Sequence, residues 1–330
     1  MRLRWYVIGV LALACLDGQA SAQTLLGMRN PGDGGRQLTT INTTTGAVAT
    51  IGSSISPPLS TIASSAVDTA NNRIFFDGTP SGETDPRIYT VSLVDGSVVT
   101  NPTMTGAAAS PIMGIEFDEA EGVIYAYRSL SGARQLVTIS RTTGVVTALG
   151  AGTGASTSSS SGVCALDPTG NRFFIVGQFV GDTDSRLFIF NTTNGSVSNV
   201  TMAGTGALPI NGLEWDAGEG VLYAVRNPGG GARQLATINT ATGAVTGLGT
   251  GTGVNTTSSS GVDALDAAGN RFFFIGTPSG DTDPRVYTFD TTTGAITASP
   301  TVVGGASAPF ATLNYEPTAL PAGRTSFSVE

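Results

Sequence analysis

The feature that most constrains the fold of this chain is a repeat of about 50 residues. An acidic residue that ends an apolar segment and opens a turn recurs at this interval, as Asp68, Asp118, Asp167, Asp216, Asp266 and Glu316. Units of this kind cannot bury an apolar face alone, so they have to pack against one another. The chain of 330 residues is therefore predicted to be one repeat protein, although its length would otherwise suggest two domains.

Each unit contains four segments with the pattern of β-strands. In the unit at 210–249 they are Gly212–Trp215, Val221–Arg226, Gln234–Asn239 and Ala244–Gly247. The last two flank a polar run that ends in glycine, which is typical of a hairpin loop with glycine in the left-handed region. Such turn glycines recur as Gly46, Gly96, Gly144, Gly195, Gly243 and Gly294. Four-stranded units of this length predict the blades of a β-propeller.

The two ends of the chain determine the number of blades. Residues 24–29 match a second strand, at 221–226, whereas residues 311–316 match a first strand, at 211–216. The ends therefore supply different strands of one blade, which closes the ring and removes free sheet edges. Five continuous units and this divided one predict an all-β, six-bladed β-propeller over residues 23–317, with a loose tail at 318–330. Alternate units are the more similar, so the ring is expected to have pseudo-threefold symmetry in two-blade steps.

The first 22 residues have the pattern of a secretory signal peptide. Arg2 and Arg4 precede an apolar core at Trp5–Leu16, which is too short to span a bilayer, and residues 20–22 are small, as a cleavage site requires. The alternative, a lipoprotein anchored through Cys15, lacks the large aliphatic residue expected three positions earlier. We expect a secreted or periplasmic protein with no membrane span.

The composition removes several chemistries. Histidine is absent and all 16 basic residues are arginine, so neither a histidine-dependent nucleophile nor a catalytic lysine is available. The formal net charge of -8 disfavours nucleic acid as a partner. Cys164 is the one cysteine that follows the leader, so no intrachain disulfide is expected, and its apolar surroundings predict an inert buried thiol.

The segment LATINTATGAV at 235–245 carries a strand, a polar turn, Thr-Gly and a second strand. It resembles the blade hairpin of secreted bacterial propeller repeats, the YVTN-like and related families of unassigned function. The resemblance extends over about residues 24–316. It implies a propeller fold and no particular activity, because these families do not share one.

Loops that join second to third strands should lie on one face of the ring and belong to two alternating kinds. Three are acidic and end in arginine: Glu83, Asp85 and Arg87; Asp182, Asp184 and Arg186; Asp281, Asp283 and Arg285. Three carry arginine pairs around glycine: Arg29 with Arg36, Arg128 with Arg134, and Arg226 with Arg233. Carboxylates two residues apart suit calcium, but arginine occupies the third ligand position. We therefore expect acidic loops to pair with arginines of neighbouring blades, and this face to bind the ligand.

First strands should line the central channel. Glu116, Glu214 and Asn314 occupy matching places there, and Asp263 lies one position earlier in its blade. The set is similar to the inner carboxylates and amides that hold one metal in six-bladed calcium-dependent hydrolases and lactonases. We expect a structural role instead, in which arginines that open second strands, Arg73, Arg172 and Arg271, form ion pairs with the glutamates, and the metal site is the alternative.

Strand, turn and packing account for most recurring residues. The sequence therefore predicts a secreted, non-enzymatic propeller, a monomer without a cofactor, that binds a protein or glycan of the cell envelope or its surroundings. The alternative is a calcium-dependent hydrolase or lactonase with Ca²⁺ in the channel.

Overall fold

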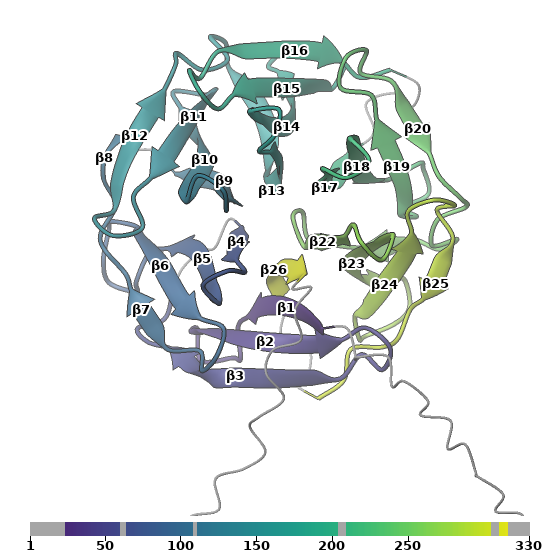
Figure 1. Cartoon of the computed structure of the whole chain (residues 1–330). Coiled ribbons are helices and arrows are strands. Elements are labelled where there is room, and N and C mark those ends of the chain that lie inside the picture. Colours follow the sequence, from purple (N-terminus) through teal and green to yellow (C-terminus); the bar gives the residue numbers. More distant parts are fainter. Residues whose placement is uncertain (1–23, 60–63, 108–110, 204–208, 305–309, 316–330) are drawn as a thin grey trace, which may run out of the picture.

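The structure is a computed structural model that describes residues 24–59, 64–107, 111–203, 209–304 and 310–315. These residues contain no α-helix and form six sheets arranged in a ring, with the first strand of each sheet at the centre (Figure 1). The predicted six-bladed β-propeller is therefore confirmed. Within the same ranges no helix is long and apolar enough to cross a membrane. The predicted signal peptide at 1–22 and tail at 318–330 lie outside the described residues.

Each sheet is one blade, numbered here around the ring. Blade 1 contains β26 (Phe310–Tyr315), β1 (Thr24–Arg29), β2 (Arg36–Asn42) and β3 (Val48–Ile55). Blade 2 contains β4 (Ser65–Asp68), β5 (Arg73–Gly78), β6 (Arg87–Ser92) and β7 (Val98–Thr100). Blade 3 contains β9 (Ile112–Asp118), β10 (Val123–Leu130), β11 (Ala133–Ile139) and β12 (Val145–Leu149), with β8 (Thr105–Gly106) at its outer edge.

The remaining three blades repeat this order. Blade 4 contains β13 (Thr157–Asp167), β14 (Arg172–Phe179), β15 (Arg186–Asn191) and β16 (Val197–Thr201). Blade 5 contains β17 (Ile210–Asp216), β18 (Val221–Arg226), β19 (Gln234–Ile238) and β20 (Val245–Gly247). Blade 6 contains β22 (Asp263–Asp266), β23 (Arg271–Pro278), β24 (Arg285–Asp290) and β25 (Ile296–Ala298), and β21 (Thr256–Thr257) extends its first strand.

Blade 1 closes the ring as the sequence predicts. Strand β1 lies between β2 and β26, and Leu26 is opposite Asn314 in the antiparallel pair of β1 with β26. The two ends of the described chain thus share one sheet (Figure 1). No other blade depends on strands so far apart in sequence, so this pairing fixes the ring as a whole.

The core lies between blades rather than within one. Second strands such as β14 are apolar on both faces because each blade is covered on both sides by its neighbours. Phe174 of blade 4, which is fully buried, packs against Trp215 of blade 5 with ring centroids 5.5 Å apart. Burial of one such ring contributes about 1.5–3 kcal/mol, so the interblade seams supply most of the stability.

The recurring acid of the repeat organises the turn after each first strand. The carboxylate of Asp216 accepts hydrogen bonds from the backbone N–H groups of Gly218 and Glu219, at 2.8 and 3.0 Å. Asp118 does the same in blade 3 with Ala120 and Glu121. A short acceptor side chain at this place replaces a missing backbone partner, which explains the 50-residue period of the acid.

Blades 4 and 6 add an arginine to this turn. Arg172 pairs with Asp167 at 2.6 Å, and its guanidinium lies 5.0 Å from the ring of Trp215 in the next blade. Arg271 pairs with Asp266 and lies over Tyr315 in the same way. Each arginine therefore joins a buried carboxylate of its own blade to an aromatic ring of the next.

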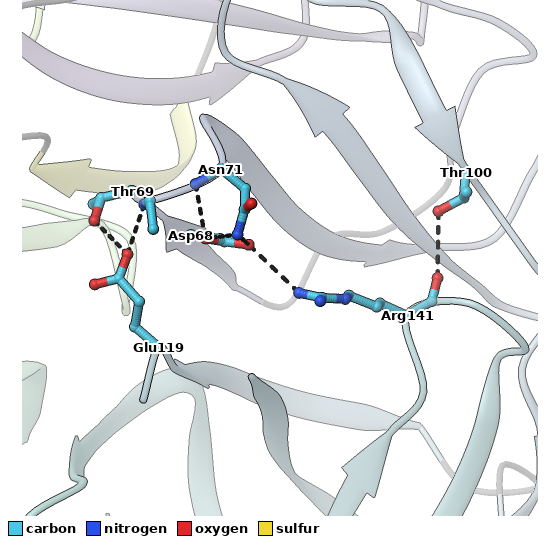
Figure 2. A network of polar contacts seen from close by, with 7 residues as sticks. Asp68, Thr69, Asn71, Thr100, Glu119 and Arg141 are labelled. Atoms are coloured by element: carbon cyan, nitrogen blue, oxygen red, sulfur yellow. Dashed lines mark hydrogen bonds and ion pairs between the residues drawn. The ribbon is translucent and has the colours of Figure 1, made fainter. Parts of the chain in front are cut away.

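Blade 2 uses an arginine from its neighbour instead (Figure 2). Arg141 of blade 3 reaches Asp68 at 3.4 Å, and Glu119 accepts hydrogen bonds from the backbone of Ala70 and the hydroxyl of Thr69. The equivalent seam, between blades 2 and 3, is thus held by a different set of residues.

The antiparallel order of strands divides the loops between two faces. Turns after first strands and the hairpins of third and fourth strands form one face, here the turn face; for example, Leu93 donates to the carbonyl of Asn72 at 2.9 Å. Loops between second and third strands and the interblade links form the other, here the link face. Ser81 of a loop donates there to Pro58 of a link at 2.7 Å.

Candidate functional site

The three acidic loops of the link face close on themselves. Their ion pairs join residues four apart in one loop: Arg87 to Glu83 at 2.9 Å, Arg186 to Asp182 at 3.2 Å, and Arg285 to Asp281 at 3.0 Å. The prediction that they pair with arginines of neighbouring blades is therefore wrong, because the arginine of the same loop is closer. These exposed pairs each contribute about 0–1 kcal/mol. The second acids of the loops, Asp85, Asp184 and Asp283, lie exposed at their tips.

The first arginine of each arginine pair lies inside the link face. Arg128 and Arg226 are only 7% and 9% exposed, and they donate to the side-chain carbonyls of Gln135 and Gln234 at 2.7 and 2.6 Å. Arg29 makes the equivalent contact with Gln37, at 3.2 Å. Burial lowers the pKa of Arg128 and of Arg226. These arginines fix the loop to the following strand.

The second arginine of a pair connects two blades. Nε of Arg134 in blade 3 donates to the hydroxyl of Ser159 in blade 4 at 2.8 Å. Arg233 in blade 5 makes the same bond to Ser258, which lies between β21 and β22 of blade 6, at 3.0 Å. Among the described residues, no ion pair joins either arginine to a carboxylate. Arg36 is the equivalent arginine of the third pair; it is half-buried, and burial lowers its pKa.

Two equivalent hollows adjoin these serines on the link face. The hollow between blades 6 and 1 has a volume of about 310 Å³, and the one between blades 4 and 5 about 270 Å³. The first is lined by Thr257, Ser258, Ser259, Thr277, Thr282 and Phe310, among others. The second is lined by Ser158, Ser159, Ser160, Gln178, Ser185 and Ile210, among others. Hydroxyl groups from one blade and an apolar side chain from the next therefore face the same space in both.

Serine-rich bulges carry these hydroxyls to the mouth of the channel. Strand β13 pairs with β14 as far as Ser159 and again from Cys164, so the residues between them bulge out of the sheet. Gly162 and Gly261 end the bulges of blades 4 and 6 with positive φ. They approach so closely that a β-carbon on Gly261 would stand 2.6 Å from the carbonyl oxygen of Gly162. This contact narrows the link-face end of the channel.

The four predicted channel residues lie around one cavity of about 200 Å³. Glu116, Glu214, Asn314 and Asp263 all line it, and so does Cys164. Asp263 is 6% exposed, whereas Glu116 and Glu214 are partly exposed. Both glutamates lie deep in the ring, so the exposed part of each faces this cavity rather than bulk solvent.

Channel side chains meet in pairs across three of the seams. Asn314 of blade 1 donates to Ser65 of blade 2 at 2.6 Å, and Cys164 of blade 4 donates to Glu116 of blade 3 at 3.5 Å. Glu214 of blade 5 faces Asp263 of blade 6, whose charge acts on it. The roles of Ser65 and Cys164 were missed from sequence, although both align with Asp263.

In two of these channel pairs, a glycine of the preceding blade leaves space for the side chain of Asp263 or Cys164. A β-carbon on Gly212 would stand 2.5 Å from Oδ2 of Asp263, and one on Gly114 would stand 2.8 Å from Sγ of Cys164. The side chain of one blade thus lies against the bare backbone of the preceding blade.

The buried acids favour their protonated forms. Burial raises the pKa of Glu116 to about 8, and the hydrogen bond from Cys164 lowers it in part. Burial, then the charges of Asp263 and Glu116, raise the pKa of Glu214 well above its ordinary value. Burial also raises the pKa of Asp263, while a hydrogen bond from the backbone of Leu213 opposes this. Burial and Glu116 raise the pKa of the Cys164 thiol, as expected for an inert cysteine.

Arginine does not neutralise these acids. The expected pairing of Arg73, Arg172 and Arg271 with channel glutamates is wrong, since Arg172 and Arg271 pair with the turn acids Asp167 and Asp266. Second strands begin at the turn face, so their first side chains meet the turn rather than the channel. Within the described ranges, no three Cys, Asp or Glu side chains are placed to hold one metal ion.

Comparison with known proteins supports the fold. No protein-family model and no curated protein sequence matches the chain, so the YVTN-like resemblance stays a prediction. A TolB structure from Acinetobacter baumannii matches over 90% of this chain and 67% of its own, at 17% identity and a TM-score of 0.62. A chain of the nidogen/laminin complex matches over 89% and 98%, at 13% identity and 0.60. A candidate 6-phosphogluconolactonase from Bacteroides uniformis matches over 88% and 99%, at 10% identity and 0.53. At these identities the likeness shows the propeller fold alone.

Proposed function

We propose that this protein is a non-enzymatic binding module that recognises a glycan through its link face. The observation that carries the proposal is the pair of equivalent hollows between blades 4 and 5 and between blades 6 and 1. Each combines several hydroxyl groups with apolar side chains, among them Ile210 of blade 5 in one hollow and Phe310 of blade 1 in the other. Pyranose rings present the matching combination of hydroxyl edges and an apolar face.

The arginines of this face act as supports rather than as ligand contacts. Arg134 and Arg233 hold Ser159 and Ser258, one serine in each hollow. Substitution of either arginine would free the serine hydroxyl that it holds. Arg233 therefore remains relevant to binding because it fixes Ser258, and Arg226 because it fixes Gln234 of the same blade. The exposed tips at Asp184 and Asp283 are free to add polar contacts at the rim.

Repetition of the hollow favours a polymer over a single small molecule. Two sites of the same chemistry, held at a fixed spacing by a rigid ring, bind a repeating chain with an effective concentration that one sugar cannot provide. A repeating glycan of the cell envelope or its surroundings suits a secreted or periplasmic protein. The nidogen/laminin neighbour illustrates that a propeller of this shape occurs in a binding complex.

The hydrolase alternative has less support. Its metal requires several ligands around one point, and the described carboxylates are not grouped in that way. The three channel acids are nevertheless brought together, and they receive a separate interpretation below.

Binding of the mature chain to immobilised polysaccharides of different repeat tests the proposal. Ser160→Tyr and Ser259→Tyr place a ring in each hollow from exposed positions. We expect each single variant to weaken binding to a recognised polysaccharide at least tenfold, and the double variant to abolish it. Thr193→Tyr with Thr292→Tyr, exposed on the turn face, is the matched control and should bind as the parent does. Unchanged binding by the doubly filled variant would refute the proposal, and binding of proteins but no polysaccharide would also contradict it.

A further inference from the structure

The channel contains more carboxyl groups than packing of the ring requires. The three seams of the same kind carry Asn314 with Ser65, Glu116 with Cys164, and Glu214 with Asp263. The first pair is neutral and satisfies both side chains with one hydrogen bond of 2.6 Å. Because a neutral pair suffices there, packing alone does not explain three carboxyl groups at the other two seams.

Asp263 lies at the wall of the cavity and has an unused acceptor. The residue is 94% buried, being 6% exposed, and it lines the cavity. Its Oδ2 atom is buried and has no hydrogen-bond partner among the described residues. A buried oxygen without a donor costs about 1–3 kcal/mol, and more if it is charged. A donor that enters the cavity would recover this energy.

The cavity has the size and chemistry for a small organic cation. Its volume is about 200 Å³, and carboxyl oxygens approach it from blades 3, 5 and 6. A metal ion needs its ligands at 2–2.6 Å from one point, which these side chains do not provide. A protonated amine presents several N–H donors along an extended body, so it can reach acceptors that lie farther apart.

The charge of the turn face favours the entry of a cation. The channel lining extends from Gly162 and Gly261, which close together at the link face, to Thr69, Leu265 and Tyr315 at the turn face. In the described turns and hairpins of the turn face, ten acids outnumber four arginines. The acids are Asp68, Asp95, Asp118, Glu119, Glu121, Asp167, Asp216, Glu219, Asp266 and Asp290, and the arginines are Arg73, Arg141, Arg172 and Arg271. Such an excess of negative charge raises the local concentration of cations.

From these observations we infer that the channel is a binding site for a small primary amine or diamine, held by Glu116, Glu214 and Asp263. The carboxyl group of Asp263 accepts from the ammonium group at the seam of blades 5 and 6. Glu116 is placed to accept from a second amino group or from water across the cavity. The neutral pair of Asn314 and Ser65 forms the remaining wall. Binding ionises acids that are protonated in the empty channel, so it releases protons.

The test uses the mature chain with 1,4-diaminobutane as the probe, at constant ionic strength. Titration calorimetry at pH 8 should show one saturable site, with an enthalpy that depends on the ionisation enthalpy of the buffer because protons are released. At pH 5 the acids stay protonated, and we expect at least tenfold weaker binding. Asp263→Asn and Glu214→Gln should each weaken binding at pH 8 by at least tenfold.

Controls separate this site from other causes. Glu119→Gln removes a charge from the turn face but none from the cavity. The affinity of this variant for 1,4-diaminobutane should therefore differ from that of the parent by less than threefold. Tryptophan fluorescence and the thermal midpoint show whether each variant is folded, and the two cavity variants serve as checks on each other. Absence of saturable binding by the parent would overturn the inference. Equal affinity in the parent and both cavity variants would overturn it, as would a saturable response to Ca²⁺ but none to the amine.

Discussion

Replacement of Glu116 by glutamine should remove one distinct part of the pH dependence of folding stability. Glu116 lies in the channel, and burial raises its pKa from an ordinary 4.5 to about 8. A group whose pKa is higher in the folded state stabilises the protein below the pKa of the unfolded state. That stability is lost as the pH rises through the folded-state pKa. The parent should therefore become less stable between about pH 4.5 and 8.

The size of the effect follows from the shift. Each pKa unit corresponds to about 1.4 kcal/mol, so a rise from 4.5 to about 8 gives an upper bound of about 5 kcal/mol. Water in the cavity reduces the cost of the charge, and we expect about 2–3 kcal/mol from Glu116. Cys164, Glu214 and Asp263 face the same space, and burial raises their pKa values too, so they add a slope of their own that the variant retains.

Urea unfolding at pH 5, 7 and 9 measures this slope. Trp215 is the one tryptophan after residue 22, and it packs against Phe174 of the neighbouring blade, so its fluorescence reports the integrity of the ring. Glu116→Gln should be more stable than the parent at pH 9, with a smaller difference or none at pH 5. Asp184→Asn removes an exposed charge, so its free energy of unfolding should change with pH in parallel with that of the parent. Parallel curves for Glu116→Gln and the parent would refute the reasoning, because Glu116 would then not be a buried protonated acid.

Three further changes test the packing. Gly212→Ala should destabilise the fold by about 2–4 kcal/mol in urea unfolding, because its β-carbon would stand 2.5 Å from the carboxylate of Asp263, whereas Gly218→Ala should cost under about 1 kcal/mol. Arg271→Ala breaks a pair with a buried acid and should lower stability by about 3 kcal/mol, but Arg285→Ala, in an exposed pair, by at most about 1 kcal/mol; equal losses would contradict this account. A chain that ends before β26 leaves β1 with a free edge, so its thermal midpoint should fall by more than 10 °C, and a peptide of residues 310–317 should restore part of the loss.

The repeat made the ring predictable from sequence alone. Its period, the turn acids and the matching of residues 24–29 to a second strand determine the blade count without any tertiary information. Pattern reveals such features because the same backbone environment recurs six times and demands the same residue types each time. The divided blade followed from alignment of both ends to one unit, and the pairing of β1 with β26 confirms it.

Side-chain partners were less predictable. The sequence shows that acidic and arginine loops alternate, but it does not show which arginine is nearest to which acid. A tight loop brings Arg87 to Glu83 of its own blade, whereas Arg141 crosses to Asp68 of the preceding one. The predicted channel residues line one cavity, because strand alternation specifies the inward side. Their pairing across seams depends on blade stagger, which has no local signal.

The neutral pair of Asn314 and Ser65 provides the last and most direct test, since it can be transplanted to the acidic seam. A chain with Glu214→Asn and Asp263→Ser should form one hydrogen bond at that seam, as Asn314 and Ser65 do. It also removes two buried carboxyl groups, one with an oxygen that lacks a donor. If acidity serves ligand binding and not the fold, this variant should be more stable than the parent at pH 8, by about 1–3 kcal/mol in urea unfolding. It should also lose the response to 1,4-diaminobutane. A less stable variant would show that the acids hold the ring together, because the neutral pair would then fail at the very place where the repeat makes it equivalent.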